Sequence, residues 1–571
     1  MKIPQRDIGP WARELIQECE VSRKARISAG AQWREYFLRG AAAGPPAAYN
    51  KCGEHVKTLS AHLFSPSDVR FSVDTNKSSS PQDRSNCNVA ASVLSEDFHL
   101  RGGDILFALG VTWSLVKGKT FVKEIWGHEG VDYHMVQPEM MGVLREDLDG
   151  LGPQEAFFHS TYLTPTAVRR LLIGNPRKDS IMTAVRERAK PESTDPSSRD
   201  DYFKELIIGG LNPVSLTPVN NPGGGIVHWQ DGPAPQLPAV VKTGLVRLDE
   251  LWVLDDERQD WTTIQILGED IPIMGDLQHQ NLTGIQGVHP FTEICPNPAP
   301  GYFWGRSELA DVYVLQDAIN QRMAGIERML RLQEDPNYMF KMFGGINDER
   351  MATFNKPGGY IAEDNPTAEI KSLAPELPND VFDSLRALIQ FFDDISGMKN
   401  VSQGKGESGV RSQGHAETLV RMATPRLRSR ALIVERQLED AGDLHLRLLQ
   451  HHDGTAYRAS VKPDKKGPGL LKLVDANPSE DATFTLKQLP DDCSVGVDSH
   501  SASPAFSDES RLLAFELFKG GAIDGVDLIR LTHPAHEDSL IAAAEDRAQQ
   551  EAEMLKQHPE LLEKKLSKGK K

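Results

Sequence analysis

Two apolar stripes separated by a short insert constrain the fold of this chain more than any other feature of its sequence. In the first, apolar residues recur every three or four positions, at Val312, Leu315, Ile319, Met323, Ile326 and Leu330. In the second they recur with spacings of four, three, four and three, at Val381, Leu385, Leu388, Phe392 and Ile395. Such spacing places side chains along one face of an α-helix. We therefore predict two amphipathic helices whose stripes pack against other helices.

The insert between these helices spans 334–377 and is β-prone. We expect the first helix to open at Gly305-Arg306-Ser307-Glu308 and to end before Pro336, because proline cannot continue the helical hydrogen-bond ladder. The second should begin at Pro378-Asn379-Asp380. The insert carries apolar residues that favour strands, at Tyr338, Met339, Phe340, Met342, Tyr360 and Ile361. A piece of this size cannot form a core of its own.

Outside this stretch, helical and β-prone segments alternate. Apolar residues in helical register predict helices at 10–39, 50–64, 88–109, 165–172, 507–517 and 536–565. Residues that favour β-structure predict strands at 71–73, 119–126, 133–136, 141–144, 245–254, 261–267, 470–474 and 482–489, and a β-rich run that includes Trp113 and Leu115. We expect polar loops at 75–85, 175–200 and 213–240. The predicted fold class is therefore α+β.

Length and composition indicate a globular chain of several domains. Its 571 residues correspond to about three or four domain-sized pieces. No apolar run approaches the roughly 18 residues of a membrane span, and the N-terminal sequence lacks the apolar region of a secretory signal. The five cysteines are scattered without a CxxC pair, so we expect a reducing compartment and no structural zinc.

The formal net charge of −17 restricts how the chain can handle nucleic acid. A protein that grips DNA over its whole surface is basic, because neutralising phosphates supplies most of the nonspecific affinity. An acidic chain contacts DNA only through local basic patches, or it presents a surface to which DNA does not adhere.

Three motif-like runs do not predict catalysis. The Gly404–Gly409 run matches GxGxxG, but a predicted helix precedes it where a dinucleotide site needs a strand, so a mobile loop is favoured over a nucleotide site. The Gly118-Lys119-Thr120 run lacks the earlier glycine of a phosphate-binding loop, since position 113 is tryptophan. The Asp255-Asp256-Glu257 run is typical of a solvated turn rather than a metal site. We expect no catalytic residue, cofactor or metal.

Basic residues cluster after the second striped helix. Six arginines fall within one predicted helix that is interrupted near Pro425, at Arg411, Arg421, Arg426, Arg428, Arg430 and Arg436. Carboxylates are interleaved with them, which favours a solvated or subunit-facing helix over a phosphate-contacting surface. Lys399 and Lys405 lie instead in the glycine-rich loop, which has little apolar content to bury. They are the better candidates for contact with a polyanion.

The order of these elements resembles the portal proteins, or head-to-tail connectors, of tailed double-stranded DNA bacteriophages, and most closely those of short-tailed phages. The resemblance is carried by residues 50–59 (NKCGEHVKTL), Leu63-Phe64-Ser65-Pro66, the segment 105–126, Trp304-Gly305-Arg306-Ser307, residues 315–320 (LQDAIN), the glycine-rich loop and the helix through Leu449. It spans most of residues 10–530.

This resemblance implies a ring, usually of twelve subunits, at one vertex of a capsid. By the plan of that family, 1–304 would be an N-terminal wing that contains β-structure, 305–333 and 378–396 two stem helices, and 334–377 a small α/β clip. The segment 397–414 would be a tunnel loop, 415–505 a long wing helix with wing strands, and 506–571 a helical crown with a basic tail. Strands of the clip are then expected to pair between subunits.

The resemblance also implies roles for residues. Stem packing would fall to Val312, Ile319, Met323, Ile326, Val381, Leu385, Leu388 and Phe392. Docking of terminase or an adaptor would fall to Tyr338, Phe340, Met342, Arg350 and Tyr360, and DNA contact in the channel to Lys399, Lys405 and Arg411.

The function implied by the resemblance is a conduit without catalysis of its own, through which double-stranded DNA is packaged and ejected. Its expected partners are further copies of itself, double-stranded DNA, the terminase large subunit, tail adaptor proteins, and capsid and scaffolding proteins, with no membrane. It would be assembled in the host cytoplasm and reside at the portal vertex of the virion. Two alternatives are a nucleotide-binding enzyme that uses Gly404–Gly409, and a capsid or scaffold protein without a channel.

Overall fold

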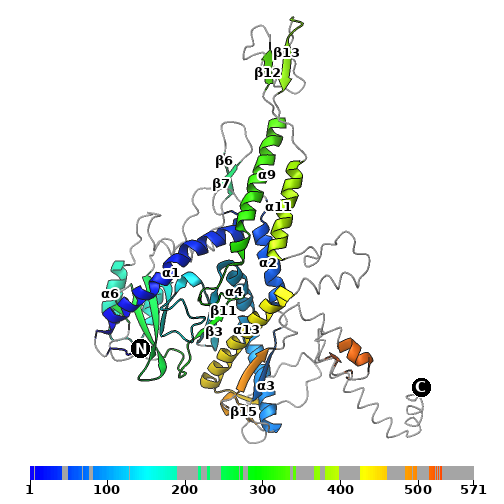
Figure 1. Cartoon of the computed structure of the whole chain (residues 1–571). Coiled ribbons are helices and arrows are strands. Elements are labelled where there is room, and N and C mark those ends of the chain that lie inside the picture. Colours follow the sequence, from blue (N-terminus) through cyan, green and yellow to red (C-terminus); the bar gives the residue numbers. More distant parts are fainter. Residues whose placement is uncertain are drawn as a thin grey trace, which may run out of the picture. The chain divides into compact units, whose positions relative to one another are not determined.

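The computed structural model shows a mixed α+β chain, as predicted (Figure 1). It describes residues 1–4, 7–41, 49–66, 69–75, 81–127, 129–188, 216–219, 228–231, 246–268, 271–273, 281–334, 338–341, 365–372, 380–397, 425–458, 483–490, 493–497 and 514–520, with positions 523, 525, 528 and 529. Among these residues no helix is long and apolar enough to cross a membrane.

The chain divides into two compact units. Unit 1 comprises Met1–Ala31, Leu59–Ser307 and Arg426–Lys571, and unit 2 comprises Gln32–Thr58 and Glu308–Pro425. The helices are α1 (Ile8–Arg39), α2 (Lys51–Leu63), α3 (Pro81–Leu100), α4 (Gly103–Lys117), α5 (Pro165–Leu171), α6 (Lys178–Arg188), α9 (Tyr313–Glu334), α11 (Asp380–Ser396) and α13 (Pro425–His452).

The strands form six small to medium sheets within the described residues. They are β1 (Phe71–Thr75), β2 (Thr120–Trp126), β3 (Val131–Val136), β4 (Met141–Val143), β5 (Ala156–Leu163), β6 (Leu216–Val219), β7 (His228–Asp231), β8 (Val246–Asp255), β9 (Asp260–Leu267), β10 (Ile271–Pro272), β11 (Phe291–Ile294), β12 (Tyr338–Lys341), β13 (Glu369–Ser372), β14 (Ala456–Arg458), β15 (Thr483–Thr485) and β16 (Cys493–Val497). Every named pair of strands is antiparallel.

The largest sheet of unit 1 has five strands in the order β10-β9-β8-β5-β4. Side chains alternate between the two faces of a strand, and here both faces are buried. One face, with Phe158 and Leu251, packs on Ala12 and Leu15 of α1. The other contributes Phe157, Trp252 and Trp261 to a second core, which the three-stranded sheet β11-β2-β3 also enters. The predicted strands at 245–254 and 261–267 are confirmed as β8 and β9, joined through the predicted acidic turn.

Two predictions about the segment before β2 are wrong. The single helix predicted at 88–109 is two helices, α3 and α4, because Gly102 adopts a left-handed backbone conformation with φ 71°. Trp113 and Leu115 belong to α4 and not to a β-rich run. The local preference for β-structure is outweighed by the burial of a helical stripe. Phe107, Val111 and Leu115 recur every four residues and are buried.

Three loop predictions are also corrected. The polar segment 75–85 ends early, since α3 begins at Pro81. The range 175–200 contains α6, whose Ile181, Met182 and Val185 are buried against α5 and β8. Within 213–240, β6 pairs with β7. By contrast α5 begins as predicted, since Thr164 Oγ1 accepts a hydrogen bond from Ala167 N and caps the helix.

In unit 2, α9 and α11 pack side by side, and the β12–β13 pair follows at one end of them (Figure 1). Both striped helices are therefore confirmed, but the first opens later than predicted. Gly305 has a left-handed φ of 65°, and Glu308–Asp311 forms a 3₁₀ turn before the α-helix begins at Tyr313. The left-handed glycine is incompatible with the α-helix expected from 305 onward.

The β12–β13 pair lies within one chain, with Tyr338 opposite Ser372. Pairing of this insert between subunits stays a prediction. Phe340 is half-buried, while Met342, Arg350 and Tyr360 lie outside the described residues.

The C-terminal third confirms part of what the sequence predicts. The described part of the Arg-rich helix is α13, which begins at Pro425, a position that proline favours. Residues 415–424 lie outside the described part of the chain. The strand predicted at 482–489 covers only β15, because a 3₁₀ turn occupies Leu486–Gln488. Residues 514–519 are helical as predicted for 507–517, and the elements predicted at 470–474 and 536–565 lie outside the described residues.

A buried ion pair joins the five-stranded and three-stranded sheets of unit 1. The Nζ of Lys123 on β2 contacts Oε2 of Glu250 on β8, and both side chains are at least nine-tenths buried. His159 Nδ1 lies 3.6 Å from the same oxygen, too far for a hydrogen bond. Burial alone would raise the pKa of Glu250, but the charge of Lys123 outweighs it and that pKa is lowered to about 2. Glu250 is therefore ionised, and its buried negative charge is compensated by Lys123.

We predict that Lys123→Met destabilises unit 1 by about 3–5 kcal/mol, because Glu250 is left buried without a partner. Urea unfolding followed by tryptophan fluorescence measures this, since Trp252 and Trp261 lie in the adjoining core. The matched control is Lys2→Met, whose ion pair with Glu257 is exposed and whose loss should not change the midpoint. Equal midpoints for Lys123→Met and the unchanged protein would contradict the prediction.

Candidate assembly site on the paired helices

The predicted stripe residues are buried to different degrees. Four of them are buried in the single chain, namely Val312, Ile319, Ile326 and Phe392. Four others are half-buried, namely Met323, Val381, Leu385 and Leu388. Val312 precedes α9 instead of lying on it. Leu330 and Ile395, expected to continue the stripes, are exposed. The stripes thus account for packing between α9 and α11 but leave apolar surface at both helices.

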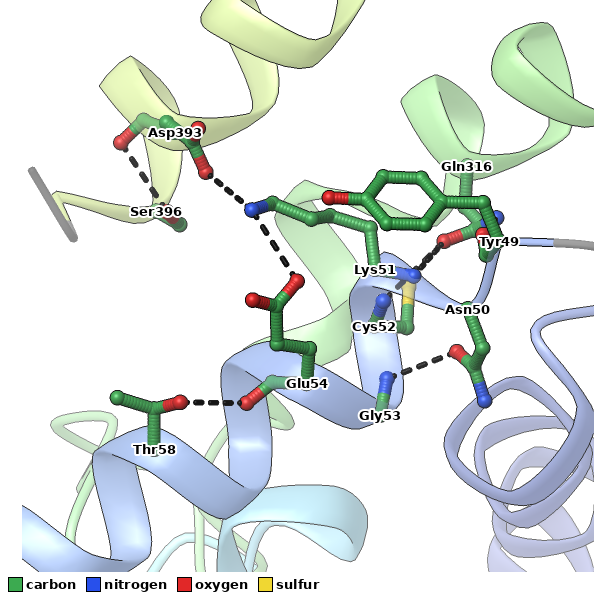
Figure 2. Close-up of polar contacts among 10 residues, drawn as sticks. All are labelled: Tyr49, Asn50, Lys51, Cys52, Gly53, Glu54, Thr58, Gln316, Asp393 and Ser396. Carbon is green, nitrogen blue, oxygen red and sulfur yellow. Dashed lines mark hydrogen bonds and ion pairs between the residues drawn. The ribbon is translucent and has the colours of Figure 1, made fainter. Parts of the chain in front are cut away.

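A buried glutamine on α9 caps the first turn of α2 (Figure 2). Gln316 Oε1 accepts hydrogen bonds from the backbone N–H of Lys51 at 2.9 Å and of Cys52 at 3.1 Å. Its Nε2 donates to Tyr49 O at 2.9 Å and to Asn320 Oδ1 at 2.9 Å. The first N–H groups of a helix have no partner within the helix. Gln316 supplies that partner from another helix and so fixes α2 to α9.

Lys51 ties the same turn to α11. Its side chain is 2% exposed, and Nζ lies 3.0 Å from Asp393 Oδ1 and 3.3 Å from Glu54 Oε2 (Figure 2). Burial alone would lower the pKa of Lys51, but Asp393 and the neighbouring Tyr49 and Glu54 outweigh it and raise the pKa. The amine therefore stays charged, and the ion pair with Asp393 holds the end of α11 against α2.

Asn50 and Asn320 add contacts to the end of α1. Asn50 Oδ1 accepts from Gly53 N at 2.8 Å, as an N-cap residue does, and its Nδ2 donates to Phe37 O at 2.9 Å. Asn320 Nδ2 donates to Gly40 O at 2.9 Å. A Cβ on Gly53 would lie 2.7 Å from Phe37 O, so only glycine allows this approach.

Buried aromatic and ionisable side chains complete this joint. Tyr36 donates to Asp317 Oδ2 at 2.7 Å, and its ring packs edge-on against Tyr313. Burial together with the bond to Asp317 raises the pKa of Tyr36. His55 Nε2 lies 3.2 Å from Glu308 Oε1, and its ring meets Phe392 edge-on. These contacts bring α1, α2, α9 and α11 together at one joint.

Sequence reasoning missed this joint. The available signal was polar: Gln316, Asp317 and Asn320 lie between the apolar residues of the first stripe. Two of the segments named in the sequence analysis, 50–59 and 315–320, contact each other here.

A second row of positions on α11 carries an exposed aromatic side chain. It follows positions with spacings of four, three, four and three, at Asp380, Ser384, Ala387, Phe391 and Asp394. Phe391 is 55% exposed, and the adjacent Ile395 is also exposed. Exposed apolar side chains grouped on one helix face mark interaction sites.

The outer face of α9 has a different character. Exposed residues with spacings of seven, seven and four occur at Val314, Gln321, Arg328 and Leu332. Val314 is 59% exposed. The helix balances three arginines against three acidic residues, whereas α11 carries four aspartates and one arginine. The outer face of α9 carries Arg328, and the outer face of α11 carries Asp380 and Asp394. The two faces are therefore complementary in charge.

The other predicted site residues divide into two groups. Lys399, Lys405, Arg411 and the Gly404–Gly409 run lie outside the described residues. On α13, Arg436 is exposed and pairs with Glu439 at 2.9 Å and Asp440 at 3.7 Å on the same helix. That is the solvated arrangement favoured by the interleaved carboxylates.

The motif-like runs in unit 1 have structural partners. Lys119 Nζ lies 2.6 Å from Glu293 Oε2, in a largely buried ion pair. Asp256 contacts the amino group of Met1 at 2.7 Å. In the part of the chain that the structure describes, no three histidine, cysteine or carboxylate side chains are grouped to hold a metal.

Comparison with models of protein families and with curated proteins found no match to this chain.

We predict that Gln316→Leu frees the first turn of α2. Two buried N–H groups lose their acceptor, at a cost of about 1–3 kcal/mol each. The amides of Lys51 and Cys52 should then exchange hydrogen at least about tenfold faster, since 1.4 kcal/mol is a factor of ten. Gln321→Leu on the exposed face of α9 is the matched control. Unchanged protection of α2 in Gln316→Leu would show that the cap does not hold the helix.

Proposed function

We propose that this protein is a phage portal protein, the ring-forming subunit of a DNA channel at one capsid vertex. The observation that carries the proposal is the outer face of the paired helices. Their inner stripes meet within one chain, while Phe391 and Ile395 of α11 and Val314 of α9 are left exposed. Burying an apolar side chain stabilises by about 1.5–3 kcal/mol. A neighbouring copy would supply that burial.

The charges of the two outer faces favour contact between α11 of one copy and α9 of another. The α11 face carries Asp380 and Asp394, and the α9 face carries Arg328, so the face of α11 fits α9 of the next copy better than another α11. Contacts between two different surfaces of a subunit generate a ring when the rotation closes. The 22 residues of α9 span about 33 Å, long enough to line a section of channel.

The remaining parts fit the same proposal. The β12–β13 pair, at one end of the helix pair, would be the docking element for terminase and later for tail adaptors. The charge of −17 per chain, repeated around a ring, would let DNA slide without tight phosphate binding. Lys399, Lys405 and Arg411 would supply the local contacts to DNA. ATP hydrolysis would belong to the packaging motor, and the protein would have no catalysis of its own.

Microscopy of the purified protein tests the ring. We expect rings with a central hole in negative stain, and we expect Phe391→Asp to abolish them while circular dichroism of the subunit is unchanged, because the side chain is exposed before assembly. Ile173→Asp, at an exposed apolar position in unit 1, is the matched control and should still form rings. Absence of rings at every salt concentration, or normal rings from Phe391→Asp, would overturn the proposal.

Charge reversal tests the direction of the contact. Arg328→Glu should weaken ring formation, and adding Asp380→Arg in the same chain should restore it, because each subunit then presents exchanged charges to its neighbours. Mass photometry across a salt series measures the fraction in rings. The matched control is Arg386→Glu, since Arg386 already pairs with Asp383 on its own helix. A double variant no better than Arg328→Glu would rule out this pairing.

A further inference from the structure

The turn between α5 and α6 in unit 1 carries exposed basic and apolar side chains. Ile173 is 76% exposed, more than any other large apolar side chain among the described residues, and Leu171 is also exposed. Three arginines are exposed around them, at Arg169, Arg170 and Arg177. Ile173 N donates to Arg170 O at 3.2 Å, so a helical turn continues through Ile173. Residues three and four apart on such a turn are neighbours, which places Ile173 beside the first two arginines. We call these five residues the turn surface.

The arginines of the turn surface have no carboxylate partner in the part of the chain that the structure describes. No described aspartate or glutamate lies at ion-pair distance from any of the three. Exposed arginines elsewhere in unit 1 are paired, as Arg145 is with Asp147 and Arg436 with Glu439. The turn surface is thus a local excess of positive charge on a chain whose net charge is −17.

The residues beneath the turn surface hold it in place. Val168 and Leu172, from the same turns, are buried in the core that α5 and α6 form with β8. Asn175 Nδ2 donates to Ile273 O at 2.8 Å, and its Oδ1 accepts from Arg177 N at 2.9 Å. One exposed aliphatic side chain is common on a protein surface. Here it is fixed beside three arginines, and a surface that is fixed before binding loses little conformational entropy when a partner binds.

The chemistry of the turn surface selects one class of partner. A phosphate backbone would neutralise the arginines, but it offers no apolar surface to Ile173. A purely apolar surface would cover Ile173 but leave the guanidinium groups without acceptors. A protein segment that carries carboxylates beside apolar side chains satisfies both, because a guanidinium binds a carboxylate through two parallel N–H groups. Arginine is also enriched where proteins bind one another.

We propose that the turn surface is a docking site for an acidic segment of another protein that also carries apolar side chains. The carboxylates of that segment pair with the three arginines, and an aliphatic or aromatic side chain covers Ile173. The inference does not depend on ring formation. Ile173→Asp should therefore abolish docking while rings still form.

Selection from a random peptide library, with the full chain as bait, tests the docking site. We expect the enriched peptides to combine aspartate or glutamate with leucine, isoleucine or phenylalanine. Fluorescence anisotropy then measures the affinity of one labelled enriched peptide. Arg170→Glu and Ile173→Ser should each weaken binding at least about tenfold, and added salt should weaken it as well. Both side chains are exposed, so the circular dichroism of the two variants should be unchanged.

The matched controls make the same two kinds of change on α13. Arg436→Glu reverses one exposed positive charge, and Leu432→Ser removes one exposed aliphatic side chain. Both controls should bind the peptide as tightly as the unchanged protein.

Four results would overturn the proposal. The first is enrichment of no peptide or of peptides without acidic residues, and the second is equal affinity of the unchanged protein and Arg170→Glu. The third is a labelled DNA duplex that binds the unchanged protein more tightly than the peptide does and is lost in Arg170→Glu, which would mark a nucleic-acid site. The fourth is a loss of oligomers in Ile173→Ser, measured by mass photometry, which would assign the turn surface to a second copy of the chain.

Discussion

Unit 2 depends on one buried amide. Gln316 on α9 accepts from two backbone N–H groups at the start of α2 and donates to the carbonyl of Tyr49. Without it, these backbone groups would be buried and unsatisfied, which costs far more than a hydrogen bond contributes. Lys51 extends the same turn to Asp393 on α11. The relative placement of α2, α9 and α11 therefore follows from polar contacts, and the apolar stripes pack within the arrangement that those contacts define.

Unit 1 uses buried charge in a comparable way. Lys123 pairs with Glu250 between its two main sheets, and Lys117 pairs with Glu139 at 2.7 Å in an equally buried place. Such pairs add little net stability compared with apolar residues of the same size, because desolvation offsets the attraction. Removing one partner of such a pair is costly, because the other charge stays buried without compensation. The pairs therefore disfavour alternative packings that would separate the two charges. We infer that they fix which sheet face meets which, while the aromatic core around Trp252 and Phe157 supplies the stability.

The proposed ring would account for the apolar side chains that α9 and α11 leave exposed among the described residues. A single stripe on each helix would suffice for a helix pair. The second row on α11, with Phe391, and the exposed Val314 on α9 would be a liability in an isolated subunit. Their unequal charge makes contact between unlike faces favourable, and contact of this kind gives a ring when the rotation between neighbours closes.

The sequence by itself determined the elements whose signals are local. The periodicity of four and three residues predicted α9 and α11, Thr164 and Pro165 predicted the start of α5, and β-favouring runs joined by an acidic turn predicted β8 and β9. It failed where tertiary packing overrode local preference, as at Trp113 and Leu115 in α4 and at left-handed Gly305. Only the tertiary structure brought Gln316 to Lys51 and His445 to Asp97. These partners are 265 and 348 residues apart, and no local pattern encodes a contact at that separation.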